Sequence, residues 1–159
     1  MSTTRKLGEP CHIGLALAAH GYDRQVVLGV MRYARPYRDW TFHHEWPDTK
    51  GVAFLVGREV DGIIGNLADP GCRSQIDAAA IPGVHVYAQE PVAGMPWVST
   101  DDILVGRLAA DHLHCVGCRH YAYFGNEQYY WSLQRRTGFR KGLADLHCAR
   151  AYSEFLSHG

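Results

Sequence analysis

The sequence predicts an α/β fold, a doubly wound parallel sheet with helices on both of its faces. Short apolar runs that resemble buried strands alternate with stretches whose apolar residues recur every three or four positions, as on one face of a helix. Such alternation is typical of parallel strands joined by right-handed crossovers. Polar residues directly follow several of the runs, which places them at strand ends, where open α/β sheets bind ligands.

The first expected strand, residues 11–17, is an apolar run interrupted by His12 and Gly14, and its composition predicts burial on both faces. We expect a helix after it that begins at an Asp23 N-cap and ends before Pro36. The other strands expected in this half are short runs with few charges: 40–45, 60–66, 84–87 and 97–99. Two weaker helices are expected at 51–59 and 73–80, and a turn at 69–71 precedes the second helix.

The second half is expected to open with the most regular helix of the chain, which starts at Thr100-Asp101-Asp102. Apolar residues at helical spacing, together with one histidine, are expected to form its core-facing side: Leu104, Val105, Leu108, Ala109, His112 and Leu113. Gly117 is placed to end this helix in the left-handed conformation. A strand at 120–124 and a helix at 132–146 complete the expected elements.

Composition excludes several protein classes. Sixteen basic and sixteen acidic side chains balance, so the whole chain has no basic field that would attract nucleic acid. The apolar runs are too short to cross a bilayer, and the first ten residues, MSTTRKLGEP, lack the apolar region of a signal peptide. Five cysteines, an odd number spread along the chain, predict reduced thiols. We therefore expect a soluble, cytoplasmic protein with no membrane partner.

Motifs of common enzyme classes do not occur in the sequence. Neither G-x-x-x-x-G-K-[ST] nor G-x-G-x-x-G follows the first strand, which argues against a phosphate loop and a dinucleotide site. The G-x-S-x-G elbow of hydrolases is missing, and no sequence spacing forces two carboxylates together. We expect neither enzymatic activity nor a cofactor.

The segment DHLHCVGCRH, residues 111–120, raises a metal hypothesis, because C-x-x-C spacing flanked by histidines suits zinc. A closed site would need a second pair of ligands, for which His147 and Cys148 are the nearby candidates. The alternative is that Cys115 and Cys118 are ordinary small residues at the end of an amphipathic helix. A redox C-x-x-C normally begins a helix, where the helix dipole lowers the thiol pKa, and this one ends a helix. We expect no metal, and a thiol- or metal-binding protein stays an alternative function.

Polar and aromatic side chains at the expected strand ends and helix starts favour a sugar site. The segment AAHGYDRQ, after the first strand, offers side chains suited to hydroxyl groups rather than the bare backbone amides that a pyrophosphate needs. Asp101 stands at a helix start, Trp131 lies in a loop, and Arg135 follows in the next helix. Carboxylates and guanidinium groups bind vicinal hydroxyls in paired hydrogen bonds, and an aromatic face packs against the C–H surface of a sugar. The open alternative is that the aspartates cap helices, Tyr22 packs against the fold and the arginines form a solvated face.

Five segments, in this order, resemble the effector-binding domain of LacI/GalR-type transcription regulators: GYDRQVVLGVMRYA, DGIIGN, VSTDDILVGRLAADHL, HYAYFGN and WSLQRRTGFRKGL. The patterns YDRQVV-x-GV and W-x-x-x-R-R-x-x-F resemble most closely the xylose operon activators, which join a periplasmic-binding-protein-like sensor to an AraC-type helix-turn-helix unit. The resemblance extends from about residue 11 to residue 146.

This resemblance implies a two-lobed sensor in which a sugar closes the hinge between lobes and thereby alters DNA binding by a homodimer. It implies a pentose-like effector, xylose or a similar sugar, and DNA contact only through a domain outside this chain. Arg135 matches the arginine three places before the glycine of an R-x-x-G pattern, here Gly138. The full set of positions implied for ligand binding is His20, Tyr22, Asp23, Asn66, Gln89, Asp101, Trp131 and Arg135.

The expected domain organisation has three parts: a flexible N-terminus at 1–10, the first lobe of the sensor at 11–99, and the crossover with an incomplete second lobe at 100–159. Because sensors of the family are longer, the resemblance implies a truncated chain with at most weak affinity for its ligand. The tail ARAYSEFLSHG is expected to end without completing a sheet. A stand-alone sugar-binding module without a transcriptional role stays an alternative.

Overall fold

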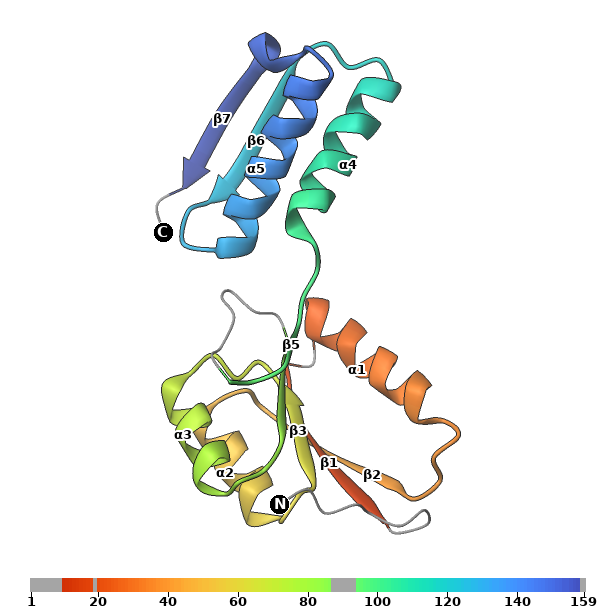
Figure 1. The fold of residues 1–159 in the computed structure, drawn as a ribbon, viewed down its shortest axis with the longest axis vertical. Coiled ribbons are helices and arrows are strands. Elements are labelled where there is room, and N and C mark those ends of the chain that lie inside the picture. Colours follow the sequence, from red (N-terminus) through yellow and green to blue (C-terminus); the bar gives the residue numbers. More distant parts are fainter. Residues whose placement is uncertain (1–9, 19, 87–93, 158–159) are drawn as a thin grey trace. The chain divides into compact units, whose positions relative to one another are not determined.

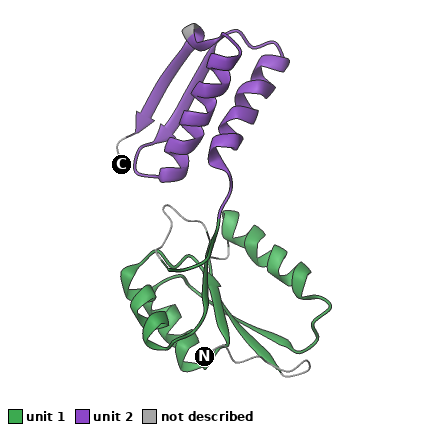
Figure 2. Ribbon diagram, viewed as in Figure 1, with its two compact units in different colours: residues 1–98 green, residues 99–159 purple. Residues whose placement is uncertain are grey.

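The structure, a computed structural model, describes residues 10–18, 20–86 and 94–157. The chain divides into two compact units, residues 1–98 and 99–159, which Figure 2 shows in green and purple. Each unit contains a sheet whose strands all pair in parallel, which confirms the α/β fold class that the sequence predicts. Within the described ranges, none of the helices combines the length and apolar character needed to cross a bilayer.

Strands and helices alternate along the first unit (Figure 1). In chain order the elements are β1 (Cys11–Ala16), α1 (Gly21–Ala34), β2 (Trp40–Glu45), α2 (Thr49–Gly57), β3 (Gly62–Gly65), α3 (Pro70–Ala78), β4 (Gly83–Val86) and β5 (Trp97–Val98). The order within the sheet is β2-β1-β3-β4-β5. The chain leaves β1 toward β2 and then returns past β1 to β3, so the direction of winding reverses. Such a reversal creates a switch point between the carboxyl ends of β1 and β3.

The core of the first unit lies between the sheet and the helix pair α2 and α3. Its buried side chains come from β1, α2, β3, α3 and the connecting segments: Ala16, Val52, Leu55, Val60, Ile63, Leu67, Cys72, Ile76 and Met95. Leu15 and Ala16, which are adjacent and therefore point to opposite faces of the sheet, are both fully buried. The prediction that β1 is covered on both faces is thus confirmed for its second half.

Two expected helix starts are wrong. Helix α1 begins at Gly21 rather than after an Asp23 N-cap, and His20 holds the cap position without a side-chain hydrogen bond. Helix α3 begins at Pro70, within the stretch that we expected to be a turn. Proline suits the first helical position because its missing N–H has no partner there. The Asp69 carboxylate caps the helix by accepting hydrogen bonds from the backbone nitrogens of Gly71 at 2.7 Å and Cys72 at 3.2 Å.

The second unit is built from α4 (Asp102–Cys115), β6 (Tyr121–Asn126), α5 (Tyr130–Asp145), a 3₁₀-helix (Ala149–Ala151) and β7 (Tyr152–Ser157). β6 and β7 pair in parallel along their whole length, from Tyr121 opposite Tyr152 to Asn126 opposite Ser157. The expectation that the tail leaves the sheet incomplete missed this strand. Gly117, with φ of +86°, ends α4 in the left-handed conformation as predicted.

Helix α4 does not pack with the face that its apolar pattern predicts. Leu104 and Leu108 are 49% and 57% exposed, whereas Gly106 and Ala110 are buried. A Cβ atom at Gly106 would overlap the carbonyl oxygen of Arg135, so the buried face is the one that lies directly against the backbone of α5. Small side chains let two helices approach closely, and this approach decides which face of α4 is covered.

Candidate functional site

A group of polar and aromatic side chains lies at the carboxyl edge of the β6–β7 sheet. The two parallel strands end opposite each other at Asn126 and Ser157, and α5 begins shortly afterwards at Tyr130. Open α/β sheets bind ligands at this edge, where loops and helix N-termini meet. The geometry therefore marks it as the place where the second unit can hold a small molecule.

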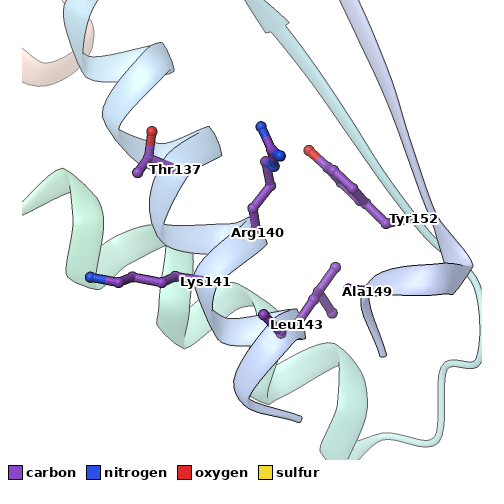
Figure 3. Close-up of a pocket in the computed structure, with 7 residues that line it drawn as sticks. Thr137, Arg140, Lys141, Leu143, Ala149 and Tyr152 are labelled. Carbon is purple, nitrogen blue, oxygen red and sulfur yellow. The ribbon is translucent and has the colours of Figure 1, made fainter. Parts of the chain in front are cut away.

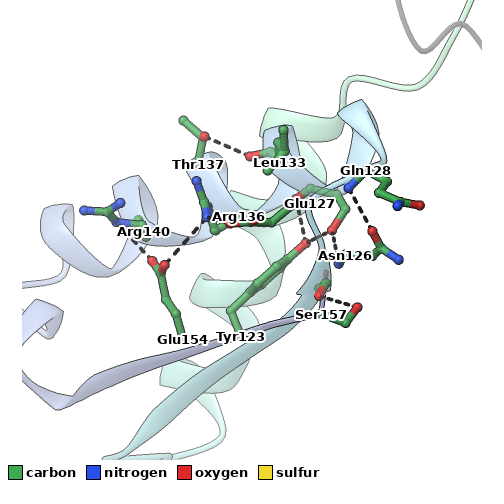
Figure 4. Close-up of polar contacts among 12 residues, drawn as sticks. Tyr123, Asn126, Glu127, Gln128, Leu133, Arg136, Thr137, Arg140, Glu154 and Ser157 are labelled. Atoms are coloured by element: carbon green, nitrogen blue, oxygen red, sulfur yellow. Dashed lines mark hydrogen bonds and ion pairs between the residues drawn. The ribbon is translucent and has the colours of Figure 1, made fainter. Parts of the chain in front are cut away.

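Hydrogen bonds fix the loop between β6 and α5 (Figure 4). The backbone nitrogen of Asn126 donates to Ser132 Oγ at 3.0 Å, and the Tyr123 hydroxyl donates to the Ser132 carbonyl at 2.7 Å. The side-chain oxygen of Asn126 accepts from the backbone nitrogen of Gln128 at 2.8 Å. Because that oxygen is used inside the loop, the side-chain NH₂ group of Asn126 is the part that can donate to a ligand.

Arg135 is held in place by an acidic and an aromatic neighbour. Its Nε donates to Asp102 Oδ1 at 2.8 Å, and the Asp102 side chain is only 10% exposed. The centre of its guanidinium group lies 4.8 Å from the Trp131 ring centroid, within range of a cation–π interaction. These contacts use Nε and the face of the guanidinium group. Its two Nη groups form no hydrogen bond with a described residue, so they can bind a pair of vicinal hydroxyls.

The close approach of α4 and α5 brings Asp102 to Arg135. Gly138 faces the backbone of α4, where a Cβ atom would overlap the Ile103 carbonyl. Gly106, one turn further along α4, faces the backbone of α5 at Arg135. Glycines at these two positions let the N-terminal halves of the helices touch through their backbones, which places the first turn of α4 beside the second turn of α5.

The two adjacent aspartates at the start of α4 have different partners. Asp101 is exposed, and its Oδ1 accepts a hydrogen bond from the Leu104 backbone nitrogen at 2.9 Å, as an N-cap does. Asp102, in the first helical turn, binds Arg135 and also accepts from the Thr100 hydroxyl at 3.0 Å. Ligand binding by Asp101 stays a prediction, but sequence reasoning missed Asp102, the carboxylate that orients the arginine.

Trp131 contacts two neighbours with its ring. Besides Arg135, it stacks on Tyr129 with a centroid distance of 5.5 Å and an interplanar angle of 18°. Its indole Nε1 is buried and has no hydrogen-bond partner among the described residues. The ring lies in the first turn of α5 rather than in the expected loop, and it anchors the arginine. Its packing against a sugar stays a prediction.

In the first unit, predicted site residues lie around the switch point between β1 and β3. Asp23 Oδ2 accepts a hydrogen bond from the Ala18 backbone nitrogen at 2.7 Å, which ties α1 to the end of β1. The backbone nitrogen of Asn66, directly after β3, donates to the Ala16 carbonyl at 3.0 Å. The structure therefore brings the segments that carry Asp23 and Asn66 together at one edge.

The other predicted ligand-binding residues of the first unit are His20, Tyr22 and Gln89. His20 is exposed, and its ring centroid lies 6.3 Å from that of Trp46 on the loop after β2. Tyr22, in the first turn of α1, is 37% exposed. Gln89 lies outside the described residues. Ligand binding by these residues stays a prediction.

The cysteine- and histidine-rich end of α4 brings some of the expected metal ligands close together. Cys148 Sγ lies 3.6 Å from His114 Nδ1, and the Tyr121 hydroxyl donates to the Cys118 carbonyl at 2.6 Å. Cys115 is exposed. In the part of the chain that the structure describes, no three His, Cys, Asp or Glu side chains come together as a metal ion would require.

His85 in β4 is a buried titratable group that sequence reasoning did not select. It is fully buried, and its Nδ1 accepts from the Leu67 backbone nitrogen at 3.0 Å. This hydrogen bond assigns the proton of the neutral ring to Nε2, which is buried without a partner among the described residues. Burial lowers the pKa of His85 below its ordinary value, and the nearby Gly65 carbonyl opposes this only in part.

We therefore expect stability to fall as acid is added, and a His85→Asn variant to lose part of this dependence. The unfolded chain binds the His85 proton at a higher pH than the folded chain does. The stabilising contribution is consequently complete above the ordinary pKa of 6.5 and is lost as the pH falls below it. Urea unfolding between about pH 8 and about pH 5.5 measures the slope, which one such group can change by at most about 1.4 kcal/mol per pH unit. Equal slopes in wild type, His85→Asn and the exposed-site control His120→Asn would contradict this assignment.

Comparison with known proteins relates the chain to transcription regulators. No protein-family model matches it. It is 28% identical over 134 residues to the xylose operon regulatory protein of Haemophilus influenzae, which covers 79% of this chain and 35% of that protein. It is 33% identical over 85 residues to the HTH-type transcriptional regulator GntR of Pseudomonas aeruginosa, covering 54% of this chain and 25% of that protein. The chain thus spans about a third and a quarter of the lengths of these two relatives.

A solved structure shares the arrangement of elements. The periplasmic binding protein/LacI transcriptional regulator from Alkaliphilus metalliredigens, complexed with D-xylulofuranose, aligns with a TM-score of 0.68 at 21% identity. The alignment covers 93% of this chain and 57% of that one. The chain therefore has the α/β fold of the periplasmic-binding-protein-like effector domains of LacI-type regulators.

Proposed function

We propose that this chain is part of the sugar-sensing region of a transcription regulator and that its effector is a pentose-like sugar such as xylose. The observation that carries the proposal is the position of Arg135, which Asp102 and Trp131 orient at the N-terminal ends of α4 and α5. The similarity to a xylose operon regulator supports the choice of a pentose, as does the D-xylulofuranose bound by a protein of the same fold.

The chemistry of the edge suits a neutral polyol. The Nη groups of Arg135 can donate to two adjacent sugar hydroxyls, and the side-chain NH₂ of Asn126 can donate to a third. The Asp102 carboxylate balances the positive charge of Arg135, so the pair does not require an anionic ligand. In the first unit, Asp23 and Asn66 offer a second polar edge at the switch point of that sheet.

The remaining parts of the proposal come from the resemblance and from the relatives. We assign direct DNA contact to other segments of a longer protein, because the chain corresponds to only about a third of the Haemophilus regulator. The full-length regulator is then a cytoplasmic homodimer that resembles the xylose operon activators. Its AraC-type helix-turn-helix unit binds the operator.

The test is a titration of the chain with D-xylose, followed by the amide and side-chain NMR signals of the second unit. We expect signals of Asn126, Trp131 and Arg135 to shift, with a dissociation constant of about 1 mM or weaker, since one open edge covers only part of a small ligand. An Arg135→Gln variant loses the two Nη donors and is expected to bind at least about ten-fold more weakly.

The matched control is Arg119→Gln, which removes an exposed arginine from the loop before β6. It is expected to leave the shifts unchanged. Shifts that survive Arg135→Gln, or that appear only at residues far from Asn126 and Trp131 in the second unit, would refute the proposed sugar site.

A further inference from the structure

A cavity of about 400 Å³ opens in the second unit between the middle and end of α5 and the beginning of β7 (Figure 3). Its volume is in the range of pockets that hold small molecules. Arg140, Leu143 and Ala144 line it from α5, and Tyr152 lines it from β7. The cavity lies near the start of β7, whereas Asn126 and Ser157 mark the opposite, carboxyl ends of the same strands.

The charge that lines the cavity is positive. Arg140 and Lys141 are among its lining residues, and no acidic side chain is. The nearest carboxylate of the surrounding network is Glu154, whose two oxygens lie 3.4 Å from Arg140 Nε and 3.8 Å from Arg136 Nη1 (Figure 4). Arg136 also lies 3.9 Å from Glu127, so Glu127 and Glu154 together balance Arg136 and Arg140. The uncompensated positive charge of the lining is Lys141, which forms no ion pair with a described residue.

The polar groups that line the cavity include a buried tyrosine hydroxyl. The Tyr152 hydroxyl, which points toward the Arg140 guanidinium in Figure 3, is buried and forms no hydrogen bond with a described residue. Burial raises the pKa of Tyr152, and the Glu154 carboxylate beside the hydroxyl raises it further, so the hydroxyl stays protonated and can donate either to Glu154 or to a ligand. Unsatisfied buried donors are costly, and an occupant with acceptor oxygens would satisfy them.

The rest of the lining is apolar except for Thr137, whose hydroxyl donates to the Leu133 carbonyl at 2.9 Å. Leu143 is fully buried, and Ala144 and Ala149 present only methyl groups. A ligand that matches both parts carries an oxyanion at one end and a short carbon chain at the other. We propose that this cavity binds a small organic oxyanion, a phosphate or carboxylate on a short carbon chain, paired with Arg140 and Lys141.

Calorimetric titration of the 159-residue chain with three anions tests the proposal: sn-glycerol 3-phosphate, glycerate and inorganic phosphate. Glycerol is the neutral comparison. We expect one equivalent of glycerol 3-phosphate or glycerate to bind more tightly than inorganic phosphate does, and glycerol not to bind. Tighter binding of the first compound assigns the site to phosphates, and tighter binding of the second assigns it to carboxylates.

Two variants and one control locate the site. Arg140→Gln removes the cation next to Tyr152 and is expected to weaken anion binding at least about ten-fold. Ala144→Leu fills the cavity from an exposed helix position without changing charge, and is expected to abolish binding while circular dichroism stays unchanged. Arg119→Gln removes an equal charge elsewhere and should bind as wild type does. The proposal is overturned if no anion binds, if glycerol binds as well as the anions, if Ala144→Leu binds normally, or if Arg119→Gln weakens binding as much as Arg140→Gln.

This site is independent of the proposed sugar site. Arg135→Gln is expected to leave anion binding intact, and Arg140→Gln to leave the response to xylose intact. Failure of one proposal can therefore be told apart from failure of the other.

Discussion

A Gly138→Ala substitution is expected to destabilise the second unit by about 3 kcal/mol or more. The added methyl group would overlap the Ile103 carbonyl on α4, and a backbone atom cannot rotate away as a side chain can. The helices must separate instead, which uncovers Ala110, Phe139 and Leu143 in the core. The same separation moves Asp102 away from Arg135, so the response to xylose should be lost together with stability.

Urea unfolding followed by the amide signals of β6 and α5 measures this loss in the second unit itself. The control is Gly29→Ala in α1, an exposed helical glycine whose added Cβ has no heavy atom within 4 Å. Because Gly29 lies in the first unit, its effect is followed by the amide signals of α1 and β1. Alanine in an open helical position favours the helix, so this control should be neutral or stabilising by up to about 1 kcal/mol. If Gly138→Ala costs less than about 1 kcal/mol, then α4 and α5 are not in backbone contact as described.

A Leu55→Ala substitution is expected to cost the first unit about 2–5 kcal/mol. Leu55 is fully buried in the core beneath the sheet, where its side chain lies against Gly14 of β1 and packs among residues of β3 and α3. Removing the methine and two methyl carbons from that position leaves a cavity that neighbours on a rigid sheet cannot fill.

The neighbouring residue gives a matched control on the same helix. Phe54 is 48% exposed, and the Arg58 guanidinium lies 4.7 Å from its ring centroid. Phe54→Ala should therefore cost no more than about 1 kcal/mol, although it removes a larger side chain. Urea unfolding monitored on amides of β1 and β3 distinguishes the two variants. Equal losses of unfolding free energy would show that Leu55 does not lie in the core.

The strands of the first sheet could be predicted because the information is local. The run 60–66 consists mostly of apolar residues and glycine and is too short for a typical helix, so burial in a sheet is the main option. Helix boundaries were harder to predict, because more than one residue near a helix start can have the composition of an N-cap. Asp23 has the composition of an N-cap, yet its carboxylate bonds to Ala18 from inside the first turn.

The packing of α4 could not be predicted from hydrophobic periodicity alone. The pattern identifies Leu104 and Leu108 as one face of the helix, but it does not identify the neighbour against which the helix lies. The signal that could have shown the true contact is the set of small residues, Gly106 and Ala110 on one helix and Gly138 on the other. Strand β7 was missed for a related reason, because its partner β6 is distant in sequence and pairing is a tertiary property.

The candidate site was predicted in part. Arg135 and Trp131 were selected for their chemistry, and the structure places them in contact with each other. The choice between Asp101 and Asp102 depends on helix geometry, because the first residue is used as the cap and the second is left to pair with the arginine. The cavity between α5 and β7 has no sequence signature, since residues from both elements line it only after folding.

The measurement that tests the central claim most directly is the observation of magnetisation transfer between D-xylose and the protein. Intermolecular nuclear Overhauser effects from the sugar ring protons report which side chains touch it. We predict contacts to the Trp131 indole, the Asn126 side-chain amide and the Arg135 side chain, all of which disappear in Arg135→Gln. Contacts confined to other residues of the second unit, or contacts that persist unchanged in that variant, would contradict the claim that the Asp102-held arginine recognises the sugar.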